Sequence, residues 1–141
     1  MAASSPISPA VSARILHAAL MLGVMLFFGV GWYVGSRRSM PISAVPDRPV
    51  LYLGLFFLSA VLFGAAVYMA GRLTGPAPGI SQDEWWRANL TRAIGIWSLV
   101  EAPTLLGTVA YLVTHDFRTL IATLTGLLLF VNYRPSRLAE A

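Results

Sequence analysis

The 141-residue sequence contains no cysteine and no lysine. Without cysteine, the chain can form no disulfide, iron–sulfur cluster or thiolate metal site, and it has no cysteine nucleophile. Its ten basic residues are all arginine, and charged residues make up only 11% of the chain, against about 25% in an ordinary soluble domain. A soluble protein of this length needs more polar surface than that. The composition therefore excludes a water-soluble globular enzyme.

The motifs of several functional classes are also missing from the sequence. The net charge of +4 is spread over loops and ends, with no basic cluster interleaved with aromatic residues, so we expect no nucleic-acid partner. The sequence has no nucleotide-binding loop, no Ser/His/Asp arrangement and no His-Glu zinc motif. We therefore expect a protein that is not an enzyme and that uses neither a metal nor another cofactor.

Apolar residues make up 57% of the chain, and the mean hydropathy is +0.70. They gather in four stretches, at 15–36, 50–71, 93–114 and 117–133. The first three are long enough to cross a hydrocarbon core of about 30 Å as helices, and the fourth is at the lower limit. We expect an all-α fold: a polytopic membrane protein with a bundle of four transmembrane helices. It forms a single membrane domain over 1–141, with tails at 1–13 and 134–141.

A cleaved signal peptide is the alternative interpretation of the first stretch. Its apolar run is longer than the roughly 7–15 residues of a signal h-region, and Arg37 and Arg38 follow it directly. We therefore favour a membrane helix. The N-terminal segment, the second loop and the C-terminal segment carry six of the ten arginines, and the opposite side carries four. This bias predicts that both termini are cytoplasmic.

The third helix has a recognisable start. Ser81 is followed three positions later by Glu84, which is the spacing of a capping box, in which each side chain accepts a hydrogen bond from the other residue's backbone. We expect a helix over 81–114, of which 93–114 is the membrane part.

Three further local patterns predict contacts of the helices. Trp85 and Trp86 fall where the third helix enters the membrane, so we expect them in the headgroup belt that indole rings prefer. Asp116 is placed to cap the fourth helix. Gly31 and Gly35 form a pair of small residues one turn apart, a pattern typical of a helix-packing face.

Glu101 is the only carboxylate inside any of the four stretches. A charged side chain near the bilayer centre costs on the order of 3 kcal/mol, and low dielectric favours the neutral form of a carboxyl. The only arginine in the stretches, Arg118, is the second residue of the fourth, so no arginine at the depth of Glu101 can pair with it. We therefore expect Glu101 to be a neutral, proton-carrying carboxyl, and its candidate role is proton binding. The alternative is a buried, hydrogen-bonded carboxyl that fixes helix register.

Several residues of the third helix are expected to support Glu101. Four of them share its face at helical spacing: Trp97, Ser98, Thr104 and Thr108. Pro103 removes the backbone donor to the carbonyl of Leu99 and is expected to kink the helix. At the same depth on the other helices we expect small residues, namely Gly23, Gly64 and Thr125-Gly126. Such residues are also simply what membrane helix interfaces use.

The two histidines fall at opposite ends of the predicted bundle, which excludes one haem held by both. His17 is expected to be an interfacial or packed residue. The alternative is a functional role, in which His17 passes protons towards Glu101.

The segment 94–107, IGIWSLVEAPTLLG, resembles the proton-binding helix of the proteolipid (c) subunit of the rotary ATP synthase. That family has an apolar run, then Val-Glu-Ala, a proline close behind and a glycine a turn later. The resemblance implies that Glu101 is a proton-binding carboxylate. The whole chain resembles small four-helix bacterial membrane proteins that carry a Glu-small-Pro motif in the third helix and an Arg-Pro-Ser/Thr end, here Arg134-Pro135-Ser136. This resemblance implies a bacterial inner-membrane location and brings no established activity.

Two functional hypotheses follow. In the first, Glu101 binds or relays protons, as in a proteolipid subunit, and Ser98, Thr104 and Thr108 donate to it or hydrate it. In the second, the chain is an accessory or structural subunit of a larger membrane complex, and Glu101 is a structural hydrogen-bonding residue. The expected partners are the lipid bilayer and either a second copy or a larger membrane complex.

Overall fold

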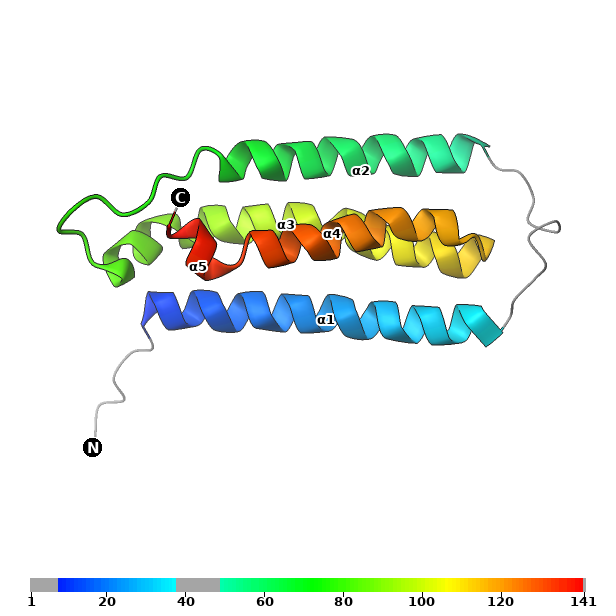
Figure 1. Cartoon of the computed structure of the whole chain (residues 1–141), viewed down its shortest axis with the longest axis horizontal. Coiled ribbons are helices and arrows are strands. Elements are labelled where there is room, and N and C mark those ends of the chain that lie inside the picture. The colour runs from blue at the N-terminus through cyan, green and yellow to red at the C-terminus, as the bar shows by residue number, and fades with distance from the viewer. Residues whose placement is uncertain (1–7, 38–48, 141) are drawn as a thin grey trace, which may run out of the picture.

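A computed structural model of the chain describes residues 8–37 and 49–140. This part is all-helical and contains no strand (Figure 1). The elements in chain order are α1 Pro9–Arg37, α2 Pro49–Ala70, α3 Gln82–Thr114, the 3₁₀ turn η2 Phe117–Thr119, α4 Leu120–Asn132 and α5 Pro135–Leu138. The predicted tail 1–13 and first loop fall largely outside the described residues, as do Arg38 and Arg48.

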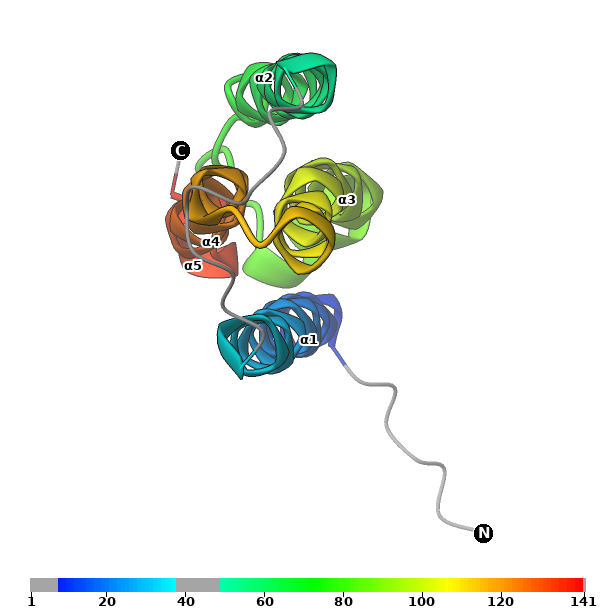
Figure 2. The same cartoon turned by 90° about the vertical axis from the view of Figure 1, so that its right-hand side faces the viewer.

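Helix α3 is the centre of the fold, because it packs against α1, α2 and α4. Seen along the helices, α1 and α2 lie on opposite sides of the α3–α4 pair (Figure 2). Helices α1 and α3 run in parallel. The start of α1, the α2–α3 loop and α5 therefore lie at one end of the bundle (Figure 1). We call this the N-terminal end, and the end where α3 passes into η2 the far end.

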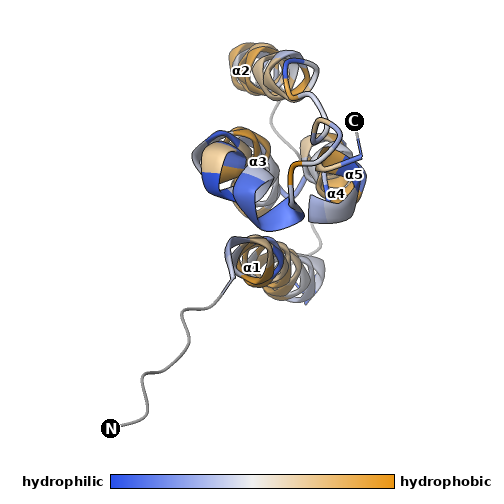
Figure 3. Ribbon diagram, turned by 90° about the vertical axis from the view of Figure 1, so that its left-hand side faces the viewer, coloured by the Kyte–Doolittle hydropathy of each residue, from blue (hydrophilic) through white to orange (hydrophobic). Residues whose placement is uncertain are grey.

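The apolar character of the helices extends to their surfaces. Helices α1, α2 and α3 have 29, 22 and 33 residues and are long and apolar enough to cross a membrane, and the segment 117–132 is a shorter apolar helix. Large apolar side chains point outward, with 61% of Leu26, 67% of Leu53 and 74% of Phe56 exposed. Hydrophilic residues are concentrated in the first turns of α3, whereas α1 and α2 are hydrophobic along most of their length (Figure 3).

The helix ends differ in places from the sequence predictions. Helix α1 begins at Pro9, six residues before the apolar stretch, because Pro is favoured at the first helical position. The fourth predicted helix starts with the 3₁₀ turn η2 before α4, and Pro135 starts the short helix α5 in the predicted tail. The capping box of Ser81 is confirmed with both of its hydrogen bonds.

The two adjacent tryptophans do not face outward, although the sequence placed them in the headgroup belt. Trp85 and Trp86 are buried, with 6% and 2% of their surface exposed, and their rings meet edge to face at 4.9 Å. The indole N–H of Trp85 donates to the carbonyl oxygen of Thr74 at 2.8 Å, which ties the α2–α3 loop to the start of α3. Trp85 is thus held by the loop, whereas the ring of Trp86 packs towards Trp97 of the same helix, with the ring centroids 6.4 Å apart.

Candidate functional site

Glu101 lies on the edge of α3 that faces α1. Trp97, four residues earlier, meets the ring of His17 of α1 at 5.2 Å, and Thr108, seven residues later, packs where Gly31 of α1 passes. Residues at these spacings share one stripe of a helix, so Glu101 lies between two contacts with α1. Its side chain is partly buried.

The carboxyl of Glu101 has no hydrogen-bond or ion-pair partner within residues 8–37 and 49–140. Pro103 lies inside α3 and is buried, and the helix continues through it. The carbonyl of Leu99 therefore loses its helical donor within one turn of Glu101. The partly exposed carboxyl group is thus not held by any side chain or backbone group of the described residues.

The four residues predicted to support Glu101 do not act as one group. Ser98 is exposed, whereas Trp97, Thr104 and Thr108 are almost fully buried. The hydroxyl of Thr104 donates to the carbonyl oxygen of Val100 in its own helix. The buried hydroxyl groups of Thr104 and Thr108 therefore face the helix interfaces and not the Glu101 carboxyl.

A polar ladder between α3 and α4 uses the buried threonines. The hydroxyl groups of Thr108 and Thr123 lie 3.1 Å apart, and the Thr123 hydroxyl donates to the carbonyl oxygen of Thr104 at 3.0 Å. Thr123 is fully buried and was missed by the sequence analysis, because no pattern in the sequence pairs α3 with α4 at this level. The ladder joins the two helices by hydrogen bonds in their apolar interior.

Glycines make these close approaches possible. A Cβ atom at Gly107 would lie 2.6 Å from the Thr123 hydroxyl oxygen, and one at Gly126 would overlap the side chain of Thr104. On α1, Gly31 and Gly35 face Thr108 and the Tyr111 ring in the same way, which confirms the predicted packing pair. Of the small residues expected at the depth of Glu101, Gly23 and Gly64 have open space around them, so only Gly126 packs closely.

Side chains from two other helices cap the C-terminal end of α4. Ring nitrogen Nε2 of His17 lies 3.0 Å from the carbonyl oxygen of Phe130. The indole N–H of Trp97 donates to the carbonyl oxygen of Tyr133 at 2.9 Å. These carbonyls have no intrahelical donor because α4 ends at Asn132. A carbonyl only accepts, so Nε2 of His17 carries a hydrogen. This confirms His17 as a packed residue.

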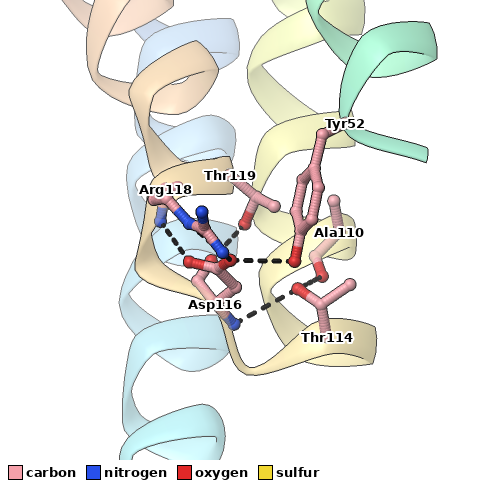
Figure 4. Close-up of polar contacts among 6 residues, drawn as sticks. All are labelled: Tyr52, Ala110, Thr114, Asp116, Arg118 and Thr119. Carbon is pink, nitrogen blue, oxygen red and sulfur yellow. Dashed lines mark hydrogen bonds and ion pairs between the residues drawn. The ribbon is translucent and has the colours of Figure 1, made fainter. Parts of the chain in front are cut away.

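A second polar cluster lies at the far end of the bundle, where η2 meets α2 (Figure 4). Asp116 caps η2 as predicted, accepting from the backbone N–H of Arg118 at 2.9 Å. Its carboxylate also pairs with the Arg118 guanidinium at 2.6 Å and accepts from the Tyr52 hydroxyl at 2.8 Å. The hydrogen bond from the Arg118 side chain, more than any other contact, lowers the pKa of Asp116 below its usual value.

The described residues contain no group of three His, Asp or Glu side chains that could hold a metal ion. The polar features therefore separate into a partnerless carboxyl on α3, a buried threonine ladder and the Asp116 cluster. No protein-family model, curated protein sequence or solved structure matches this chain, and the resemblances of segment 94–107 and of the whole chain stay predictions.

Proposed function

We propose that this chain is an integral membrane protein in which Glu101 is a proton-binding carboxyl at the seam between α1 and α3. Outward-facing apolar side chains such as Phe56 and Leu53 support membrane insertion, since soluble monomers rarely expose large contiguous apolar patches. At a rise of about 1.5 Å per residue, α2 alone is about 33 Å long and matches the hydrocarbon core.

The proposed orientation places the N-terminal end of the bundle in the cytoplasm. The start of α1, the α2–α3 loop and α5 lie there together (Figure 1). The arginines of this end include Arg72, Arg87 and Arg134, and cytoplasmic segments carry the arginine excess. A bacterial inner membrane is the location that the resemblance to four-helix bacterial proteins implies.

One observation carries the proton-binding role: the partly exposed Glu101 carboxyl has no partner in the described part of the chain. In hydrocarbon, such a carboxyl holds its proton, because the ionised form costs several kcal/mol. It can release the proton only where water or a cation reaches it. A carboxyl buried as structural glue would instead be hydrogen-bonded by its own chain.

The second candidate is an accessory subunit whose Glu101 binds a helix of another membrane protein. Ser98 supports it, because this side chain is exposed one turn before Glu101 on α3. Polar side chains on an apolar helix surface associate membrane helices through hydrogen bonds. In this case the carboxyl is satisfied by the partner and does not exchange protons.

The test is labelling with an apolar carbodiimide, which reacts with protonated carboxyls in apolar surroundings. Native membranes that contain the full chain are labelled between pH 6 and 9, and the modified residue is located by mass spectrometry. We expect modification at Glu101 that falls as pH rises and is absent in Glu101→Gln. The matched control Glu84→Gln, on the water-exposed first turn of the same helix, keeps the labelling.

The two candidates predict different results. Absence of labelling at Glu101 in folded protein between pH 6 and 8 would contradict the proton-binding role. Co-purification of another membrane protein that is lost on Ser98→Leu would then favour the accessory subunit. With labelling present, proton flux into vesicles that vanishes in Glu101→Gln supports proton relay, whereas a structural role tolerates Gln because its amide still forms hydrogen bonds.

A further inference from the structure

A groove of about 430 Å³ runs between α2 and the η2–α4 segment. Helices α2 and α1 lie on opposite sides of the α3–α4 pair (Figure 2). The walls of the groove are mostly apolar and include Leu55, Phe56 and Phe63 from α2 and Ile121 and Ala122 from α4. Phe56 and Ile121 are 74% and 65% exposed, so the groove opens to the surroundings of the bundle. We call it the α2–α4 groove.

The charged and aromatic polar side chains of the groove lie at its far end, and Ser59 and Thr125 lie about two turns further along. Tyr52 and Arg118 line the far end (Figure 4), next to Asp116. The Arg118 side chain is 63% exposed, and its guanidinium has five N–H donors in a planar fork that suits phosphate oxygens. The groove is therefore amphipathic along its length, with the exposed Arg118 side chain, paired with Asp116, at the mouth and mostly apolar walls below.

A buried hydroxyl inside the groove lacks a partner. Ser59 lines the wall and is only 6% exposed, and its Oγ atom has no hydrogen-bond partner in the part of the chain that the structure describes. Buried polar atoms are almost always hydrogen-bonded. An oxygen atom of a ligand in the groove would supply the missing partner.

The dimensions of the groove fit one hydrocarbon chain. From Tyr52 to Phe63 the groove extends for 11 residues of α2, about 16 Å at the helical rise, which is about half of the ~30 Å hydrocarbon core. A volume of 430 Å³ over that length leaves a cross-section of about 26 Å². A chain packed at ~4 Å carbon contacts needs on the order of 20 Å².

We propose that the α2–α4 groove binds a membrane phospholipid, with one acyl chain between α2 and α4 and the phosphate against Arg118. Ser59 lies two turns below Tyr52, and side chains on a helix lean towards its N-terminus, which here is the Arg118 end. Ser59 lies about 10 Å along the helix from Tyr52, so its hydroxyl donates to an ester carbonyl there. The glycerol region then lies between Arg118 and Ser59, and the acyl chain continues from Ser59 past Phe63. The site lies in the leaflet of the far end. It rests on the proposed membrane insertion but is independent of proton binding by Glu101.

The test is retention of phosphatidylglycerol by the full chain, purified in mild detergent and measured by native mass spectrometry as lipid is added. We expect one saturable lipid per chain. Ala122→Phe fills the groove and lowers the affinity at least tenfold, and the matched control Ala18→Phe, on the exposed face of α1, leaves it unchanged. Arg118→Gln lowers the affinity about tenfold, because a charge-assisted hydrogen bond to phosphate is lost, while Arg118→Lys retains part of it.

Each outcome bears on a separate part of the proposal. Equal lipid retention by wild type and Ala122→Phe would overturn it, as would the absence of any saturable lipid in wild type. Binding of a fatty alcohol as tightly as phosphatidylglycerol would overturn the role of Arg118 in binding phosphate. If Ala122→Phe does not give a monodisperse helical protein, Ser59→Leu fills the groove from α2 instead. Extraction from membranes by alkaline carbonate tests membrane insertion separately.

Discussion

Replacing Gly31 with alanine tests the central packing of α1 against α3. A Cβ atom at Gly31 would lie 2.5 Å from Cγ2 of Thr108, whereas ordinary contacts begin near 3.4 Å. The two helices must therefore separate by about 0.9 Å or the threonine must change rotamer. Overpacking of this kind costs about 1–3 kcal/mol. Gly23→Ala is the matched control on the same helix, because a Cβ there meets nothing within 4 Å.

The comparison between the two variants isolates the steric cost. Both replace a helical glycine with alanine, so the gain in helix propensity of about 1 kcal/mol largely cancels in the difference. We expect the free energy of unfolding of Gly31→Ala to be about 1–3 kcal/mol lower than that of Gly23→Ala. The measurement is reversible unfolding in mixed micelles at increasing mole fraction of SDS, followed by tryptophan fluorescence and circular dichroism.

A second substitution makes the prediction specific to one atom. Thr108→Ser removes Cγ2 and keeps the hydroxyl that lies 3.1 Å from the Thr123 hydroxyl. In this background, the difference between Gly31→Ala and Gly23→Ala should fall to a few tenths of a kcal/mol, which is a measurable coupling energy. Equal stability of the two alanine variants in wild type, or no rescue by Thr108→Ser, would refute the close approach of α1 and α3 at this level.

Two further predictions concern the polar contacts. Trp97→Phe removes the donor to the Tyr133 carbonyl and should cost about 1–3 kcal/mol in the same SDS assay, whereas Trp32→Phe, at a half-exposed ring, should cost much less. The folded-state pKa of Asp116 is lowered, mainly by its hydrogen bond with Arg118, so its ionised form stabilises the fold above the unfolded value of about 3.9. That contribution is lost as pH falls through the lower folded-state pKa. The melting temperature of wild type should therefore exceed that of Asp116→Asn by more at pH 7 than at pH 3.

The sequence predicts helices and their local caps well because both depend on neighbouring residues. A 22-residue apolar run forms α2, and Ser81 with Glu84 starts α3 by contacts three residues apart. The capping of α4 could not be predicted in this way. It joins His17 to Phe130 across 113 positions of the chain, and only the packed bundle shows that these residues meet.

The polar face predicted around Glu101 shows a second limit of sequence patterns. At about 100° per residue, positions i−3 and i+3 lie about 60° to either side of Glu101, so Ser98 and Thr104 diverge by about 120°. Helix α3 has neighbours on three sides, so that a divergence of this size sends Thr104 into the α4 interface and Ser98 outward. A helical pattern gives relative directions on one helix, but the number and position of its neighbours decide which direction is buried.

The two proposed sites lie on different sides of the same bundle, and this separates their tests. Glu101 belongs to the α1-facing edge of α3, between the contacts of Trp97 and Thr108 with α1. The α2–α4 groove is lined by α2, η2 and α4, and α2 lies on the opposite side of the α3–α4 pair from α1 (Figure 2). The packed interior of α3 and α4 stands between them, and substitutions at separated sites without shared partners have additive effects. Glu101→Gln should therefore leave phosphatidylglycerol retention unchanged, and Ala122→Phe should leave carbodiimide labelling unchanged. Cross-effects of either variant would mean that the interior transmits a structural change and that the bundle acts as one site.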